Sequence, residues 1–231
     1  RGLRADTATR LVDLPTLQQA TVTADPVLDL LRASRRTAVE PPDPDPITAE
    51  DWMADARQAW TFFERFSNPD TGLCIDTADV QGDDQWLHRE LTMWDLGSLI
   101  AAVLAAHELG LLSDADFIAR AEHLVRALPV TEIAGRLLPS EVISTDTGRS
   151  LSYDFNACDT GRLLSVLRDL DAHPLTRGLA EATTRRWDLG TVIVEGRIHS
   201  VVNGALVDRF RSHCAHYTAR AFRDRGFAAA S

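Results

Sequence analysis

Two short Asp-x-Gly sequences stand out because each precedes a run of apolar residues at helical spacing. Asp95-Leu96-Gly97 and Asp159-Thr160-Gly161 lie 64 residues apart in a chain of 231 residues. A carboxylate at such a position can accept hydrogen bonds from the exposed amides of the first helical turn, where it also suits the positive end of the helix dipole. Alternatively, in a ring of α-hairpins the starts of the inner helices converge, and the two carboxylates would then face one cleft.

Acids that face one another across a cleft can cleave a glycosidic bond. One carboxyl group protonates the leaving oxygen, and the other activates water or attacks the anomeric carbon. We therefore take Asp95, Asp159 and Glu141 as candidate catalytic residues. For any single loop acid, a solvated surface charge is the ordinary alternative, so the chemistry rests on whether these three groups meet.

Aromatic and polar residues in the same stretches are candidates for substrate binding. The indole rings of Trp86 and Trp94 have flat apolar faces on which sugar rings can stack. Tyr153 and Asp154 lie just before the second Asp-x-Gly sequence and complete the candidate set. The alternative for both tryptophans is packing in the core, and it applies more to Trp94 than to Trp86, which lies in a polar stretch.

The composition excludes several other chemistries. All 24 residues counted as lysine or arginine are arginines, so a lysine Schiff base, a Walker A loop and a kinase strand lysine are absent. Neither a Gly-x-Ser-x-Gly elbow nor a glycine-rich phosphate loop occurs, which leaves serine hydrolase and nucleotide-binding functions without support. A net charge of −10 argues against a nucleic-acid partner, and the longest apolar run, residues 99–106, is too short for a membrane span.

The histidines and cysteines do not form a pattern typical of a metal site. His213 and His216 share a helix face, but no third ligand follows at a supporting spacing. We expect no metal and no cofactor. Cys74, Cys158 and Cys214 are too few for a disulfide framework. They are either three thiols or one disulfide with a spare thiol, and both possibilities remain open.

A proline-rich stretch divides the chain. Residues 39–46 hold four prolines, which lack amide donors and keep the residues before them extended. We therefore expect residues 1–47 to form an N-terminal arm and linker, and residues 48–231 to form the main domain.

Helical periodicity dominates the second part of the chain. It predicts helices over 48–66, 95–110, 113–128, 158–171, 174–187 and 208–225. A β-branched stretch with glycine breaks predicts one small hairpin over 191–202. The residues expected in the core are Trp60, Leu99, Val103, Leu124, Leu164 and Leu167.

Several motifs occur in the same order as in a known family. The most specific is Thr92-Met-Trp-Asp-Leu-Gly-Ser98, which is followed by Leu109-Gly-Leu-Leu112, Asp159-Thr-Gly-Arg-Leu-Leu164 and Arg186-Trp-Asp188. From about residue 52 to residue 227 the chain resembles the bacterial domain of unknown function 3131. The resemblance implies a helical toroid of the glucoamylase-like kind and, by fold analogy alone, action on glycans.

The chain departs from this family in two ways. The family shows a Tyr-Glu-x-Tyr-Ala pattern near its last helix, whereas Ala215 stands here at the position of the acid. Only 185 residues follow Pro46, fewer than a complete six-hairpin ring requires. The expected fold is therefore all-α, made of antiparallel αα-hairpins of the (α/α) toroid type, incomplete, with one small β-hairpin.

These patterns lead to two functional hypotheses. The first is a glycan-active domain that takes a bacterial oligosaccharide or polysaccharide, as a glycoside hydrolase or as a relative without activity. The second is a non-catalytic scaffold or binding module for protein association. An incomplete ring leaves an apolar flank uncovered, and soluble monomers rarely expose a large apolar patch. We therefore expect a homodimer, a partner chain or the arm over residues 1–38 to cover the open edge.

Overall fold

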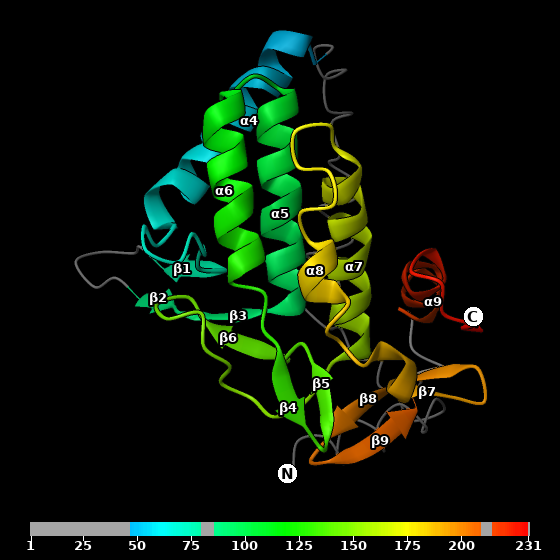
Figure 1. The fold of residues 1–231 in the computed structure, drawn as a ribbon. Helices are drawn as coiled ribbons and strands as arrows, with labels where there is room; N and C mark the ends of the chain where they lie inside the picture. The colour runs from blue at the N-terminus through cyan, green and yellow to red at the C-terminus, as the bar shows by residue number, and fades with distance from the viewer. Residues whose placement is uncertain (1–46, 80–85, 209–213, 231) are drawn as a thin grey trace, which may run out of the picture. The chain divides into compact units, whose positions relative to one another are not determined.

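The computed structural model describes residues 47–79, 86–208 and 214–230 (Figure 1). The chain divides into two compact units, Arg1–Thr48 and Ala49–Ser231, and the second unit contains every described helix and strand. The assignment of residues 1–47 to an arm and linker stays a prediction. None of the helices in the described part of the chain is both long enough and apolar enough to cross a membrane.

Helices make up the bulk of the second unit, and most of them begin and end close to the predicted residues. The first three follow the apolar periodicity, and two of them have a side-chain cap: Thr92 and Ser113 each accept a hydrogen bond from the amide three residues later, at the start of a helix. Figure 1 shows the three long central helices running side by side. The described helices are α4 (Ala49–Phe66), α5 (Met93–Glu108), α6 (Asp114–Arg126), α7 (Ala157–Ala172), the short α8 (Glu181–Thr184) and α9 (Ala215–Asp224).

Glycines in α5 and α7 allow neighbouring helices to approach the backbone closely. A Cβ atom on Gly97 would lie 3.2 Å from the Cα atom of Leu163 in α7. A Cβ atom on Gly161 would lie 2.8 Å from the Cα atom of Thr218 in α9, closer than real Cβ atoms come. The glycine of each Asp-x-Gly sequence therefore makes room for the next helix along the row.

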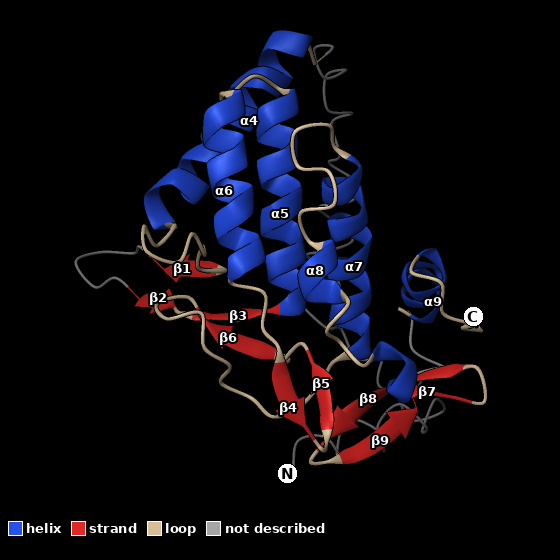
Figure 2. Ribbon diagram, viewed as in Figure 1, coloured by secondary structure: helices blue, strands red, loops and turns tan. Residues whose placement is uncertain are grey.

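Short antiparallel strands gather at the end of the molecule where α5 and α7 begin (Figure 2). The sequence predicted one hairpin, and the structure contains four small sheets among the described residues. They are β1 (Thr77–Asp79) with β2 (Trp86–His88), β3 (Glu90–Thr92) with β6 (Val142–Ser144), β4 (Thr131–Ile133) with β5 (Arg136–Leu138), and the three-stranded sheet of β7 (Ile193–Val194), β8 (Arg197–Val202) and β9 (Ala205–Asp208). The mainly helical character of the expected fold is confirmed, whereas the single expected hairpin is replaced by several short antiparallel sheets.

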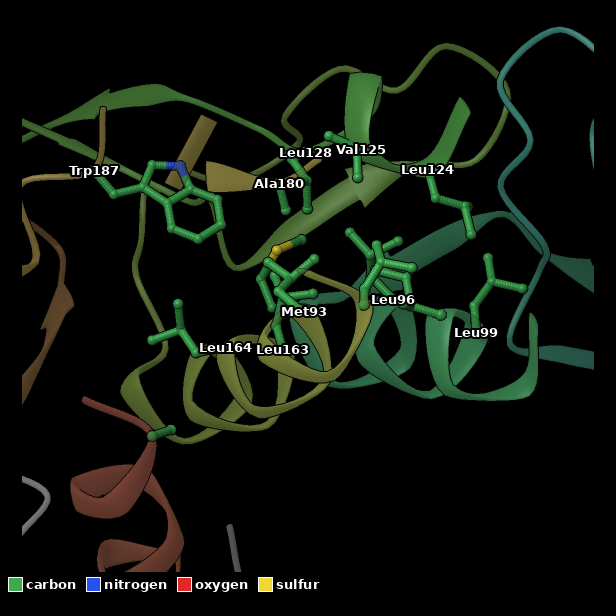
Figure 3. Close-up of a cluster of buried hydrophobic side chains, with 14 of the residues drawn as sticks. Met93, Leu96, Leu99, Leu124, Val125, Leu128, Leu163, Leu164, Ala180 and Trp187 are labelled. Atoms are coloured by element: carbon green, nitrogen blue, oxygen red, sulfur yellow. The ribbon is translucent and has the colours of Figure 1, made fainter. Parts of the chain in front are cut away.

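A hydrophobic core fills the space between α5, α6 and α7 (Figure 3). Trp187 closes one side of it, where its indole Nε1–H donates to the carbonyl oxygen of Pro129 at 2.8 Å. All six residues expected in the core are buried, which confirms this prediction: Trp60, Leu99, Val103, Leu124, Leu164 and Leu167.

Two predicted helices differ from the structure. Most of the segment 174–187 forms turns, and only α8 is helical there. Side chains take over the hydrogen bonds at this point, because Asp171 Oδ1 accepts from the amide of Ala180 at 2.7 Å and Thr176 Oγ1 donates to the carbonyl of Leu170 at 2.7 Å. The last helix begins at Ala215 and not near 208, because β9 extends to Asp208. The residues between them lie outside the described part.

Candidate functional site

Two of the three acids predicted for catalysis lie at the starts of α5 and α7, and the third lies in the segment before β6. Asp95 and Asp159 are each the third residue of their helix, and Glu141 directly precedes β6. Burial, followed by the negative charges of Glu141 and Asp95, raises the pKa of the Asp159 carboxyl group from 3.8 to about 6. Glu141 and Asp95 are therefore both near enough to Asp159 for their charges to act on its carboxyl group.

Asp95 also has the structural role that its position suggests. Its Oδ2 accepts hydrogen bonds from the Thr92 amide at 3.2 Å and from the Thr92 hydroxyl at 2.6 Å, and its own amide donates to that hydroxyl oxygen. This is a capping box with Asp in place of Glu or Gln. The capping alternative for Asp95 is therefore confirmed, and its catalytic role stays a prediction, although its charge acts on Asp159.

Asp159 has no such capping role. At the start of α7, Asn156 Oδ1 accepts from the amides of Cys158 at 3.0 Å and Asp159 at 3.3 Å. No hydrogen bond from a described residue reaches the Asp159 carboxyl group. Its side chain is left partly buried beside two other acids, and a carboxyl group with a pKa near 6 keeps its proton over much of the mildly acidic range. That is the property a general acid needs.

Glu141 is connected to α7 through the same cap residue. Asn156 Nδ2 makes a long contact of 3.5 Å with Glu141 Oε1. The amide of Glu141 donates to the carbonyl oxygen of Asp154 at 2.9 Å, which fixes the backbone of the two loop segments against each other. The predicted catalytic set thus has three members on three different segments.

Trp94 lies beside these acids as part of an aromatic and cationic group. The guanidinium carbon of Arg162 lies 4.6 Å from the centre of the Trp94 ring, and Arg162 Nε donates to Ser98 Oγ at 3.1 Å. The Tyr217 ring meets Trp94 edge to face, with ring centres 6.0 Å apart. Trp94 is 37% exposed, so part of the indole remains available to a ligand.

Tyr217 faces Asp159 electrostatically. Burial and the negative charge of Asp159 raise the pKa of the Tyr217 hydroxyl, and the positive charge of Arg162 opposes this rise. The phenol therefore stays protonated at neutral pH and can donate a hydrogen bond. The Tyr217 hydroxyl oxygen lies 3.1 Å from Cys158 Sγ and 3.5 Å from the Cys158 carbonyl oxygen.

A disulfide between Cys158 and Cys214 joins the start of α7 to the residue before α9. One disulfide with a spare thiol is therefore the correct alternative for the three cysteines. The spare thiol of Cys74 is buried, and burial raises its pKa to about 11, so it does not act as a nucleophile. The disulfide holds α9, and with it Tyr217, next to Asp159.

Three of the predicted substrate-binding residues do not join this group through any side-chain contact of the described residues, although the backbone of Asp154 binds that of Glu141. Trp86 is 57% exposed on β2 and stacks on His88 with ring centres 5.6 Å apart. Tyr153 is 78% exposed. Asp154 Oδ1 accepts from the amide of Asn203 at 2.8 Å, so its carboxylate holds the β8–β9 turn.

Three residues of the site were not predicted from the sequence: Asn156, Arg162 and Tyr217. Arg162 follows Asp159 by one helical turn, which places both on one face of α7. This spacing could have predicted Arg162 as part of the site. Tyr217 belongs to the site only because α9 packs on α7. In the described residues, no three His, Cys, Asp or Glu side chains are grouped to hold a metal ion, and His213 lies outside that part of the chain.

The sequence of the helical unit matches a family model. Residues 54–231 match the family described as "Protein of unknown function (DUF3131)". The chain belongs to this family. No curated protein sequence matches the chain.

Two solved Bacteroides structures, each described as a "putative glucoamylase", are similar in fold to this DUF3131 chain. The protein from Bacteroides fragilis superposes with a TM-score of 0.53 at 17% identity, over 69% of this chain and 42% of that chain. The protein from Bacteroides uniformis gives a TM-score of 0.51 at 15% identity, over 67% of this chain and 40% of that chain. The DUF3131 chain thus spans about two fifths of the length of each. The similarity establishes a glucoamylase-like helical fold, and the ring arrangement of its hairpins stays a prediction.

Proposed function

We propose that this DUF3131 domain hydrolyses a glycosidic bond in an oligosaccharide or polysaccharide, with Asp159 as the general acid. The observation that carries the proposal is the raised pKa of Asp159, about 6, in the presence of Asp95 and Glu141. A carboxyl group that keeps its proton beside carboxylates is the arrangement used for acid and base roles in glycoside cleavage. The fold shared with two proteins that carry a glucoamylase name supports the same class of substrate.

The proposed reaction assigns one role to each acid. Asp159 donates its proton to the glycosidic oxygen as the bond from that oxygen to the anomeric carbon breaks. Asp95 takes a proton from the water whose oxygen forms the new bond to the anomeric carbon. The products are two sugars with free hydroxyl groups, and the two protons balance between the acids. Glu141 contributes its negative charge, which raises the pKa of Asp159.

Trp94 and Tyr217 supply the surroundings for a sugar. The partly exposed indole of Trp94 offers an apolar face beside the acids, and Arg162 covers part of that ring. The protonated Tyr217 hydroxyl can donate to a ring or hydroxyl oxygen of the substrate. Ala215 stands where the family pattern places an acid, so in this chain the reacting carboxyl groups come from α5 and α7.

The test is the release of reducing ends from a panel of α- and β-glucans by the full chain. We expect wild-type protein to release reducing ends, Asp159→Asn and Asp95→Asn to lose this activity, and Glu132→Gln to retain it. Glu132 is an exposed acid on β4 and serves as the matched control. Activity should fall as the pH rises through about 6, because Asp159 then loses the proton that it donates. A folded wild-type protein without turnover on any glycan would contradict the proposal.

A second candidate, a non-catalytic association module, is favoured by the surface of α4. This helix has apolar residues along one face, yet Trp60 is its one buried residue, and Trp52 is 62% exposed. An exposed tryptophan on an amphipathic helix is typical of a surface that another protein covers. A homodimer or a partner chain at this edge stays a proposal. Light scattering distinguishes it: a dimer in the wild type that becomes a monomer in Trp52→Glu would favour this function.

A further inference from the structure

A pocket of about 150 Å³ adjoins the acid group on the α4 side of α5. Phe62 and Phe63 of α4 form one wall. Asp76, in the segment before β1, lies at another side, and Asp95 and Ser98 of α5 line the pocket as well. Two larger hollows in the described part of the chain share no lining residue with the acid group, whereas this pocket includes Asp95.

Asp95 and Ser98 belong both to the pocket and to the candidate site. Asp95 affects the pKa of Asp159, and Ser98 Oγ accepts the hydrogen bond from Arg162, whose guanidinium group covers Trp94. The two residues are three positions apart on α5 and therefore share a helix face. A ligand in the pocket would thus lie next to Asp95 and Ser98.

The size of the pocket fits one six-membered ring. A cavity of about 150 Å³ in another protein accommodates a single benzene molecule. The Phe62 and Phe63 rings lie edge to face, with centres 5.8 Å apart, and such rings offer apolar contact to the C–H groups of a pyranose. One sugar ring fills a pocket of this volume, so the pocket suits a single ring of a glycan.

The polar groups of the pocket select the charge of that ring. Asp76 Oδ1 contacts His88 Nδ1 at 2.7 Å, and its other carboxyl oxygen is not used in this pair. Asp76 and Asp95 can accept hydrogen bonds from sugar hydroxyl groups. Two carboxylates at one small pocket repel a ligand that carries its own negative charge, so a uronic acid or a phosphorylated sugar is disfavoured.

We propose that this pocket binds one neutral pyranose residue at the end of a glycan chain. The inference deepens the proposed function and rests on it for the position of the scissile bond. With the terminal sugar in the pocket, the bond to the next sugar lies beside Asp95 and Asp159. The domain then removes sugars from a chain end, and it does not cut within the chain.

Binding can be tested without cleavage by saturation-transfer-difference NMR on the full chain. The probes are D-glucose, D-galactose, D-mannose and D-glucuronate. We expect saturation of the ring protons of at least one neutral hexose and none for glucuronate. Phe63→Trp and Phe62→Trp fill the pocket and should abolish the signal, and Phe66→Trp is the control because Phe66 lies on the same helix but does not line the pocket. Circular dichroism establishes that each variant is folded.

The outcomes separate this inference from the proposed function. Absence of hexose saturation in the wild type, or equal saturation in both folded pocket-filling variants, would overturn the pocket assignment. Release of products of many lengths, with activity lost in Asp159→Asn, would overturn it as well and leave the hydrolase proposal standing. Hexose binding that Asp159→Asn retains, without turnover on any glycan, would support the pocket and remove the hydrolase proposal.

Discussion

The raised pKa of Asp159 makes a prediction about stability that does not depend on any substrate. Its folded-state pKa of about 6 lies above the ordinary value of 3.8, so the folded protein binds this proton more tightly than the unfolded chain does. Well below pH 3.8 the group is protonated in both states and does not change the free energy of unfolding. As the pH rises from about 4 to about 6, the unfolded chain loses the proton first, and the folded state is destabilised. Replacing Asp159 with Asn removes this cost.

The expected size of the effect follows from the shift. The rise from 3.8 to about 6 corresponds to at most about 3 kcal/mol well above pH 6, and solvent screening lowers this figure because the carboxyl group is only partly buried. The free energy of unfolding that Asp159→Asn gains over the wild type should therefore be about 2 kcal/mol larger at pH 7.5 than at pH 4. For a unit of this size, that difference amounts to about 4 to 8 °C in the melting temperature. The loss of a negative charge at a helix start reduces the gain by about 0.3 to 1 kcal/mol.

Urea unfolding of wild type and Asp159→Asn at pH 4 and pH 7.5 measures this difference directly. Glu132→Gln is the control, because an exposed acid should give a difference that changes little with pH. The order of the causes provides a second check by NMR titration: Glu141→Gln should lower the pKa of Asp159 more than Asp95→Asn does. A stability difference that is the same at both pH values would refute the view that burial and neighbouring charges act on Asp159.

Two further predictions concern the scaffold. Leu164→Ala should lower the free energy of unfolding by about 2 to 5 kcal/mol through lost burial and a residual cavity, because Leu164 is only 1% exposed. Leu175 is 40% exposed and should tolerate alanine within about 0.5 kcal/mol. Equal urea midpoints for the two variants would be inconsistent with the described core. Cys158 and Cys214 are 56 positions apart in sequence. Reduction of the disulfide between them should lower the free energy of unfolding by up to about 4 kcal/mol, because the unfolded chain gains conformational freedom. It should also weaken the near-ultraviolet signal of Tyr217, and a Cys158→Ser variant that unfolds and gives spectra like the wild type would contradict both expectations.

The long helices could be predicted because their signals are local. Apolar residues repeat with the helical period in α5, α6 and α7, and Thr92 and Ser113 provide side-chain caps just before two of them. The short strands could not be predicted in the same way. A strand of three residues is too short to show alternation, and β3 pairs with β6, a segment about fifty residues later. The prediction of a helix after α7 was wrong for another reason. The side chains of Asp171 and Thr176 make hydrogen bonds with backbone groups that a helix would pair with its own backbone.

The acids of the candidate site could be predicted, whereas their surroundings could not. Asp95 and Asp159 appear at matching positions of two helices, and matching helix starts lie together when the helices pack side by side. Arg162 lies one helical turn from Asp159, so helical spacing could have predicted it as well. Tyr217 depends on a helix that follows 43 residues after the end of α7, and its position is fixed by a disulfide for which three cysteines offered more than one arrangement.

The different environments of Asp95 and Asp159 arise from the residues that cap their helices. Thr92 Oγ1 accepts one amide, and Asp95 completes the capping box by accepting from the Thr92 amide and hydroxyl. Asn156 accepts two amides by itself, so the Asp159 carboxyl group has no cap to complete and remains partly buried beside two other acids. In the proposed mechanism, the acid that helps to cap α5 serves as the base, and the acid that has no capping role keeps the proton. The chemical difference between two acids at identical helix positions is then set by a threonine and an asparagine three residues before them.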